Sequence, residues 1–273
     1  MLTRRCGVLG DPIAHSLSPA LHRAAYAELG LDWTYDARRV GSGDLGAFLS
    51  ELGGEWRGLS LTMPLKREAL PLVDRLTDRA RLAGAVNTLV IEDDGTRVGD
   101  NTDLPGAVAA IRERTTAPLE TATILGGGAT ATSVGLALAD LGVRTIVLAV
   151  REEARAAETL AALRAHPAAP EVVTSTLGSG PVGSDVLVST IPASAQAPEL
   201  VAGCADVPVV FDVLYDPWPT PLVAAAADRT VVGGLDLLVH QAVLQVELFT
   251  GRTVSVDVLR DAGERALAAR HAG

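Results

Sequence analysis

One lysine stands out among the residues of this chain that could transfer a proton. The sequence holds 23 lysines and arginines together, and Lys66 is the only lysine among them. An ammonium group can exchange a proton when its surroundings change its pKa, whereas a guanidinium stays protonated. Lys66 is therefore a candidate acid–base residue. On composition alone, an exposed lysine kept by chance is an equally good interpretation.

Several other polar side chains follow apolar runs or precede helix starts in the N-terminal part of the chain. Asn87 is one of only two asparagines and stands directly before a β-branched, apolar run. In an open α/β sheet, the ends of the strands form the ligand-binding edge. We therefore expect a polar cluster at that edge, made of Ser16, Ser18, Thr62, Lys66, Asn87, Thr102 and Asp103.

Two serines precede the first predicted helix. Ser18 followed by Pro19 is typical of a helix N-cap with proline at the first helical position, and it predicts a helix to about Leu29. Ser16 has no comparable structural role in this pattern. Two hydroxyl groups beside a helix N-terminus suit a carboxylate, because the positive end of the helix dipole favours an anion.

A glycine-rich turn marks the middle of the chain. The apolar run Ala122–Leu125 leads into Gly126-x-Gly128-x-x-Ala131, and an alanine-rich stretch and a second β-branched run follow. Strand, turn, helix and strand in this order predict a βαβ unit that binds a dinucleotide. Gly126 permits the tight turn, and Gly128 lets the backbone and the helix N-terminus approach a pyrophosphate. A glycine-rich turn without a ligand is the alternative.

The end of the second strand of this unit bears on the choice between NADP and NAD. Arg151 directly follows the strand, and Arg155 lies one helical turn later. An arginine here suits the 2′-phosphate of NADP, whereas an acidic residue suits the ribose hydroxyls of NAD. The sequence therefore favours NADP, and Glu152 keeps NAD as the less favoured alternative.

The composition restricts the classes of protein and partner. A chain of 273 residues with 48% hydrophobic residues can form one large domain or two ordinary ones. The formal net charge of −10 argues against binding to nucleic acid or to an anionic membrane. Cys6 and Cys204 lack metal-type spacing, so we expect no metal and a reduced, cytoplasmic location. We expect no signal peptide, no membrane span, and a monomer or homodimer.

The predicted elements place Lys66 near the start of a helix. An apolar strand at Leu59–Leu61 leads to Pro64, and we expect a helix from Pro64 to about Leu76. Lys66 would lie in its first turn, where a cation opposes the helix dipole. Such a position is poor for a structural lysine, so it favours a functional role.

The order of the elements indicates an α/β protein with two domains. Asp93–Gly95 predicts a β-hairpin in the first, and the glycine turn predicts a Rossmann-type second domain. Two helices, 235–250 and 257–270, have no strands of their own, so we expect them to return to the N-terminal half and leave a cleft. The predicted domains are 1–103 plus 238–273 for the substrate, and 104–237 for the dinucleotide.

Short motifs on both sides of the glycine turn match one known family. They are Asp11–Pro19, Leu61–Lys66, Gly84–Thr88, Gly99–Asp103, Ser189–Pro192, Tyr215–Pro217 with Thr220–Leu222, and His240–Ala242. Each motif is weak by itself, but together and in this order they are specific. Along nearly its whole length, the sequence resembles shikimate dehydrogenase.

The resemblance implies NADPH-dependent, reversible reduction of 3-dehydroshikimate to shikimate, on the route to chorismate and the aromatic amino acids. It implies that Lys66 and Asp103 act at the reacting hydroxyl. The implied substrate-binding residues are Ser16, Ser18 and Tyr215 for the carboxylate, and Thr62, Asn87, Thr102 and Gln241 for the ring hydroxyls. The implied cofactor-binding residues are Gly126, Gly127, Gly128, Ala129, Arg151, Arg155, Thr190 and Gly234.

The chain departs from the family pattern at three places. Val150 and Glu152 flank Arg151 where the family commonly has Asn and Thr, which removes polar partners for the adenosine phosphate and adds a negative charge. Ser189–Ile191 replaces more polar residues before a later proline. Asp236 stands where the family commonly has glycine near the nicotinamide.

Two other functions remain open on the same scaffold. One is a dehydrogenase that acts on quinate or an amino-shikimate, although the Ser16-x-Ser18 pattern resembles the shikimate-specific branch. The other is a non-catalytic sensor that binds NADP and a pathway metabolite. A sensor would not need Lys66 together with Asp103.

Overall fold

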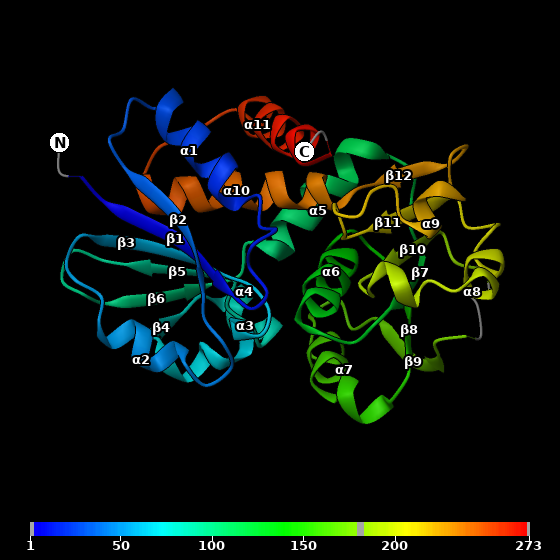
Figure 1. The fold of residues 1–273 in the computed structure, drawn as a ribbon. Helices are drawn as coiled ribbons and strands as arrows, with labels where there is room; N and C mark the ends of the chain where they lie inside the picture. Colours follow the sequence, from blue (N-terminus) through cyan, green and yellow to red (C-terminus); the bar gives the residue numbers. More distant parts are fainter. Residues whose placement is uncertain (1–2, 179–182, 272–273) are drawn as a thin grey trace. The chain divides into compact units, whose positions relative to one another are not determined.

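The computed structural model describes residues 3–178 and 183–271. The chain forms two compact units (Figure 1). Unit 1 contains Met1–Thr102 and Leu238–Gly273, and unit 2 contains Asp103–Leu237. Unit 1 is therefore assembled from two separate stretches of chain. Within the described residues, no helix has the length and apolar character needed to cross a membrane.

Unit 1 is built around a six-stranded sheet with the order β2-β1-β3-β5-β6-β4. β1 runs parallel to β2 and β3, whereas β5 runs antiparallel to β3 and β6. The strands are β1 (Arg5–Gly10), β2 (Thr34–Arg39), β3 (Trp56–Leu61), β4 (Arg75–Leu76), β5 (Thr88–Ile91) and β6 (Arg97–Asp100).

The strand register of unit 1 gathers several loops at one edge of the sheet. Leu9 of β1 lies beside Leu61 of β3, and Ser60 of β3 lies beside Thr88 of β5. Thr88 in turn lies beside Asp100 of β6. Three loops therefore start from this edge, after β1, β3 and β6. The segment that precedes β5 ends at the same edge.

Helices cover both faces of this sheet (Figure 1). They are α1 (Ser18–Glu28), α2 (Leu45–Ser50), α3 (Leu65–Glu68), η1 (Leu70–Leu72), α4 (Asp78–Ala83), the part of α10 (Gly234–Thr250) from Leu238 onward, and α11 (Val256–His271). Alternate residues of β1 pack on opposite faces of the sheet, because successive side chains of a strand point to opposite sides. Val8 belongs to the core cluster of Tyr26 and Phe249, whereas Leu9 belongs to that of Leu45.

Unit 2 contains a six-stranded, wholly parallel sheet with the order β12-β11-β10-β7-β8-β9. This is the strand order of dinucleotide-binding folds, with the switch point between β7 and β10. The strands are β7 (Thr121–Leu125), β8 (Thr145–Val150), β9 (Glu171–Thr176), β10 (Val186–Ser189), β11 (Val209–Asp212) and β12 (Thr230–Val232). The helices are α5 (Asp103–Arg114), α6 (Ala129–Asp140), η2 (Glu153–Ala156), α7 (Ala157–Arg164), η3 (Ala193–Ala195), α8 (Pro198–Gly203) and α9 (Pro221–Ala224).

The predicted α/β class with a Rossmann-type sheet is confirmed. The predicted hairpin is confirmed too, because β5 and β6 pair antiparallel on either side of Asp93–Gly95. Gly95 adopts a positive φ of 88°, a conformation that glycine reaches without the penalty of a side chain.

The predicted helix from Pro64 to Leu76 is wrong. α3 has only 4 residues, and it is followed by the 3₁₀ turn η1 and the short strand β4. Pro71 lies inside η1, where it removes a backbone N–H and would clash with the carbonyl four residues earlier in an α-helix. A helix this short has a small dipole, so the electrostatic argument about Lys66 loses its basis.

The predicted cap at Ser18 is also wrong. Leu17 is the N-cap of α1, and its own side chain makes no capping hydrogen bond. Ser18 is the first helical residue, and its N–H donates to Ser16 Oγ over 3.3 Å. Pro19 is the second residue of α1, one position later than we predicted. It fits there because the N–H of the second helical residue, like that of the first, has no partner within the helix. The hydroxyl that accepts from a backbone N–H at the start of α1 therefore belongs to Ser16, and not to Ser18 as we predicted.

Candidate active site

Lys66 is half-buried at the polar edge of unit 1. Its carbonyl accepts a hydrogen bond from Val86 N–H at 2.7 Å, one residue before Asn87. Thr62 N–H donates to the carbonyl of Leu9 at 2.9 Å. Backbone hydrogen bonds therefore hold the segment that carries Thr62 and Lys66 against the end of β1 and the start of β5.

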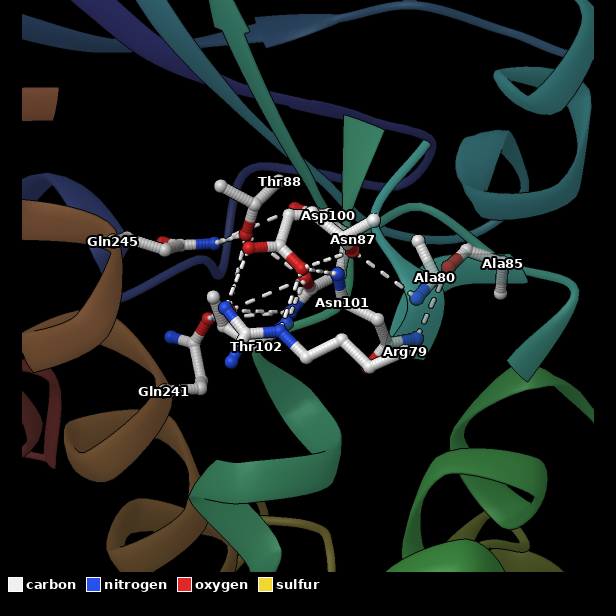
Figure 2. A network of polar contacts seen from close by, with 11 residues as sticks. Arg79, Ala80, Ala85, Asn87, Thr88, Asp100, Asn101, Thr102, Gln241 and Gln245 are labelled. Carbon is white, nitrogen blue, oxygen red and sulfur yellow. Dashed lines mark hydrogen bonds and ion pairs between the residues drawn. The ribbon is translucent and has the colours of Figure 1, made fainter. Parts of the chain in front are cut away.

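Asn87 and Thr102 form the centre of a buried polar network (Figure 2). Thr102 N–H donates to Asn87 Oδ1 at 2.7 Å, and Asn87 Nδ2 donates to Thr102 Oγ1 at 3.0 Å. The two residues are 3% and 0% exposed. A backbone N–H can only donate, so it fixes which end of the Asn87 amide is the oxygen.

Helix α10 adds Gln241 to this network (Figure 2). Gln241 Oε1 accepts from Thr102 Oγ1 at 3.4 Å and lies 3.5 Å from Asn87 Nδ2. Gln241 Nε2 donates to the carbonyl of Leu238 at 2.8 Å. Three of the residues predicted to bind ring hydroxyls thus contact one another.

Asp100 anchors the backbone that leads to Thr102. Arg79 donates from Nε and Nη2 to the two carboxylate oxygens at 2.6 and 2.5 Å, and Thr77 Oγ1 donates at 2.6 Å. Asn101 N–H donates to the same carboxylate at 2.7 Å. Burial acts to raise the pKa of Asp100, but the hydrogen bonds from Arg79 and Thr77 outweigh it and hold the pKa below its ordinary value. Asp100 is therefore an ionised structural anchor.

The loop that carries Ser16 is held by the last helix of the chain. Arg270 of α11 donates to the carbonyl of His15 at 2.9 Å and to that of Ser16 at 3.2 Å. Ser16 is partly buried and Ser18 is buried. The C-terminal stretch of unit 1 therefore holds the loop that carries Ser16.

The predicted catalytic and substrate-binding residues are divided between the two units. Asp103 is the first residue of α5 and is 6% exposed, and Tyr215 follows β11 and is half-buried. Both belong to unit 2. The predicted residues that belong to unit 1 are Ser16, Ser18, Thr62, Lys66, Asn87, Thr102 and Gln241.

The glycine turn of unit 2 lies between β7 and α6. Gly126 has a φ of 106°, and a side chain there would collide with Thr190. A Cβ on Gly127 would approach Ala156 Cβ to 2.8 Å. Gly128 is the N-cap of α6, without a capping side chain and with open space where its own Cβ would lie. The turn thus leaves the first N–H groups of α6 open to a phosphate group.

Neighbouring hydroxyl groups fasten this turn. Thr190 Oγ1 donates to the carbonyl of Leu125 at 2.9 Å, directly before Gly126. Thr159 Oγ1 of α7 donates to the carbonyl of Gly127 at 2.8 Å. Thr190 therefore supports the turn from beneath, which is a structural role in addition to the predicted contact with the cofactor.

The predicted phosphate-binding arginines lie on the surface of unit 2. Arg151 is exposed, and Arg155 Nε forms an ion pair with Glu152 Oε2 at 3.0 Å. The side chains of Arg155 and Glu152 are 78% and 60% exposed, so solvent screens this pair and its energy is small. A Cβ on Gly127 would lie 3.2 Å from Cγ1 of Val150. The side chain of Val150 therefore packs against the glycine turn.

Asp236 is occupied by contacts within unit 2. Arg114 Nη2 lies 2.6 Å from Asp236 Oδ1, and Arg114 Nε donates to Oδ2 at 3.1 Å. Gly233 N–H also donates to Oδ2, at 2.9 Å, as in a capping box at the start of α10.

Gly234 is needed for a close approach, because a Cβ there would collide with the backbone of residues 213–214.

A parallel Rossmann-type unit with an open glycine turn, joined to a unit with a buried polar edge and one lysine, defines the class of two-domain nicotinamide-dependent oxidoreductases. Residues 8–89 match the family model described as shikimate dehydrogenase substrate binding domain, and residues 234–262 match the model of the shikimate 5′-dehydrogenase C-terminal domain. The chain belongs to the shikimate dehydrogenase family.

Similarity to members of this family extends over nearly the whole chain. A shikimate dehydrogenase (NADP(+)) of Methylobacterium radiotolerans is 38% identical over 91% of this chain and 92% of its own length. The crystal structure of the Mycobacterium tuberculosis enzyme is 40% identical, covers 96% of this chain and 99% of its own, and has a TM-score of 0.86. The Thermus thermophilus enzyme, solved with NADP(H) and shikimate, is 29% identical, covers 97% and 100%, and also has a TM-score of 0.86.

The sequence analysis missed the residues that support the site. They are Tyr35, Ser60, Arg79, Thr88 and Gln245. One signal was present, because Gln241 and Gln245 lie four residues apart and therefore on one face of a helix. The contacts of Ser60 and Tyr35 depend on strand pairing between distant segments, which no local pattern indicates.

Proposed function

We propose that this protein is an NADP-dependent shikimate dehydrogenase, which reduces 3-dehydroshikimate to shikimate and catalyses the reverse oxidation. The reaction would supply the route to chorismate and the aromatic amino acids. The observation that carries the proposal is the family relationship over nearly the whole chain. The placement of the single lysine at the polar edge of unit 1 supports it further.

Lys66 is the proposed acid–base residue. In reduction, its ammonium group donates a proton to the oxygen that becomes the alcohol, and in oxidation the amine takes that proton back. Asp103 is proposed to orient the reacting hydroxyl and to influence proton transfer by Lys66. NADPH, when bound, supplies the hydride from its nicotinamide ring.

Ser16 and Ser18 are proposed to bind the substrate carboxylate, with Tyr215 as a further donor. Ser16 Oγ accepts from Ser18 N–H, which leaves the hydroxyl proton of Ser16 to donate to an anion. Thr62, Asn87, Thr102 and Gln241 are proposed to bind the ring hydroxyls. Asn87, Thr102 and Gln241 are buried, which favours strong hydrogen bonds because water competes less for them.

The turn Gly126–Ala129 fits a dinucleotide. It presents an uncapped helix N-terminus with open space at Gly128, which suits a pyrophosphate. Arg151 and Arg155 are proposed to hold the 2′-phosphate of NADP, with Thr190 and Gly234 lining the site. Arg155 must leave Glu152 to do so, which predicts a moderate preference over NAD.

We further propose a cytoplasmic location. Cys6 and Cys204 are buried, free thiols, which supports a reducing compartment. A monomer or a homodimer is the proposed assembly, and size-exclusion chromatography with light scattering distinguishes the two.

The proposed function is tested with purified protein, shikimate and NADP⁺, by following the absorbance of the reduced nicotinamide. Turnover with shikimate and a higher kcat/KM for NADP⁺ than for NAD⁺ are the expected results. Quinate and an amino-shikimate, offered under the same conditions, test the neighbouring substrates. Binding without turnover of any of these acids would instead favour the sensor.

A further inference from the structure

A continuous chain of hydrogen bonds crosses the interior of unit 1 and ends at the predicted substrate-binding amides. It begins at Tyr35 of β2, whose hydroxyl donates to Ser60 Oγ of β3 at 2.5 Å. Ser60 Oγ donates to Gln245 Oε1 of α10 at 2.7 Å, and Gln245 Nε2 donates to Thr88 Oγ1 at 2.8 Å. We call this chain, continued through Asn87, Thr102 and Gln241, the amide relay.

The second half of the amide relay follows the same direction (Figure 2). Thr88 Oγ1 donates to Asn87 Oδ1 at 2.8 Å, and Asn87 Nδ2 donates to Thr102 Oγ1 at 3.0 Å. Thr102 Oγ1 lies 3.2 Å from Asn87 Oδ1 and 3.4 Å from Gln241 Oε1, so its single proton can be donated to either oxygen. Hydroxyls and amides thus alternate, and each amide accepts a hydrogen bond at its oxygen and donates one from its nitrogen.

Two backbone groups set the direction of the relay. Thr102 N–H, which can only donate, faces Asn87 Oδ1 at 2.7 Å. The carbonyl of Asn87, which can only accept, faces Gln245 Nε2 at 3.4 Å. Rotation by half a turn would place Asn87 Nδ2 against Thr102 N–H, or Gln245 Oε1 against the carbonyl of Asn87. The Asn87 carbonyl therefore favours one orientation of Gln245, in which Gln245 Nε2 donates to Thr88 Oγ1 and leaves the Thr88 hydroxyl to donate to Asn87 Oδ1.

The relay lies away from solvent along its whole length. Gln245 is 1% exposed, Thr88 and Tyr35 are 0% exposed, and Ser60 is 5% exposed. A buried polar group without a partner is costly, and hydrogen bonds in such a network strengthen one another. Rotation of one amide therefore disfavours the present orientation of the next.

We propose that Gln245 is a positioning residue for the substrate, because it directs the Thr88 hydroxyl at Asn87 Oδ1 and so helps to hold the Asn87 amide in place. Gln245 does not itself need to touch the substrate. The inference rests on the proposed function, since Asn87 and Gln241 are the proposed ligands of the ring hydroxyls. Loss of Gln245 would let the Thr88 hydroxyl turn away from Asn87 Oδ1, so that the Asn87 amide would lose one of the contacts that hold it.

The chain offers a direct measurement, because Asn87 and Asn101 are its only asparagines. Protein labelled with ¹⁵N in the asparagine side chains gives two pairs of amide signals, and the pair lost in Asn87→Asp belongs to Asn87. In Gln245→Met, which keeps the length of the side chain but lacks its hydrogen bonds, we expect the Asn87 pair to shift and broaden. The Asn101 pair should stay, since Asn101 Nδ2 donates to the carbonyl of Ala85 at 3.1 Å, outside the relay.

Kinetics provide the second readout. Gln245→Met should raise KM for shikimate at least about fivefold, the effect of weakening one or two hydrogen bonds, with KM for NADP⁺ unchanged. Thr88→Val removes the hydroxyl between Gln245 and Asn87 and keeps a β-branched side chain in β5. It should disturb the same pair of signals, and it provides the test if Gln245→Met does not fold.

Thr123→Val is the matched control. It breaks an equally buried hydrogen bond in unit 2, between Thr123 Oγ1 and Ser184 Oγ at 2.6 Å. It should lower Tm without changing the Asn87 signals or KM for shikimate. Unchanged Asn87 signals in a folded Gln245→Met or Thr88→Val protein would overturn the proposal. If the native protein does not oxidise shikimate, the proposed function fails, and the NMR measurement still decides on the relay.

Discussion

At the scale of single residues, Lys66 is the position where a substitution should cost most activity. Lys66→Ala should lower kcat by ~10²–10⁴-fold, the usual contribution of a general acid–base group, with a smaller effect on KM. Lys66→Arg should not restore the rate, because guanidinium does not release its proton. Stopped-flow measurement of NADPH formation gives both constants.

The neighbouring cation provides the control for Lys66. Arg67 lies in the same short helix, and Arg67→Ala should keep kcat within a few-fold of the native value. A Lys66→Arg enzyme that works at near-native speed would contradict the acid–base role and return Lys66 to an ordinary surface cation.

Glu152 is the residue that should limit the preference for NADP. It pairs with Arg155 at 3.0 Å, and it repels a 2′-phosphate. Glu152→Gln keeps the shape and releases Arg155, so KM for NADP⁺ should fall about threefold, in keeping with the small energy of an exposed ion pair. KM for NAD⁺ should change little. A native enzyme that prefers NAD⁺ and loses that preference in Glu152→Gln would show that Glu152 reads the ribose hydroxyls instead.

The residue types in the sequence indicate the predicted reactive and binding residues of the site better than the residues that hold them in place. Lys66 and Asn87 are rare types in this chain, and both stand where a strand or helix changes, so they could be selected from the sequence. Tyr35, Ser60 and Gln245 are ordinary types within regular elements. Their roles arise from contacts between segments that are 25 and 185 residues apart.

At the scale of elements, local signals succeeded where a backbone constraint is strong. Gly126 and Gly95 have positive φ values, and the turns around them were predicted in the right places. The helix after Pro64 is shorter than the apolar pattern predicts, because Pro71 does not fit the interior of an α-helix. The start of α1 was misplaced because proline is accepted at more than one position of a first helical turn.

The last helix should influence substrate binding through the loop of Ser16. Arg270→Ala removes the hydrogen bonds to the carbonyls of His15 and Ser16, at 2.9 and 3.2 Å. KM for shikimate should rise about three- to tenfold, because the loop loses two charge-assisted hydrogen bonds. KM for NADP⁺ should stay the same, as measured in the dehydrogenase assay.

Arg252→Ala is the matched control for this effect. Arg252 precedes α11 and donates to the carbonyl of Leu29 at 2.7 Å, at the other end of α1. This variant should change Tm but leave KM for shikimate alone. Equal KM values for both variants and the native enzyme would mean that the Ser16 loop holds its geometry without Arg270.

At the scale of the whole molecule, His22 should make the stability depend on pH. It is fully buried against Tyr35, with ring centroids 4.0 Å apart, and burial lowers its pKa to about 4. Between pH 6.5 and 4 the unfolded chain binds a proton that the folded protein excludes. Stability should therefore fall as the pH falls through this window, by about 3 kcal/mol in total.

His22→Phe keeps the ring and removes this titration. Calorimetric scans should show that the native protein loses more Tm than the variant between pH 6.5 and 4.5. Parallel curves for the two proteins would assign the acid sensitivity to other groups, such as the carboxylate of Asp100.

Unit 1 is assembled from residues on both sides of unit 2. The bond between Ser60 and Gln245 joins residues 185 positions apart. During translation, residues 103–237 leave the ribosome as one uninterrupted stretch and can fold at once. The first 102 residues have by then already emerged, yet they lack α11 and most of α10. All six strands of the unit 1 sheet have then left the ribosome, but two of the helices that cover the sheet have not. A chain that ends before Gln245 would therefore have a whole nucleotide half, whereas its other half would leave apolar residues of the sheet open to proteases and chaperones.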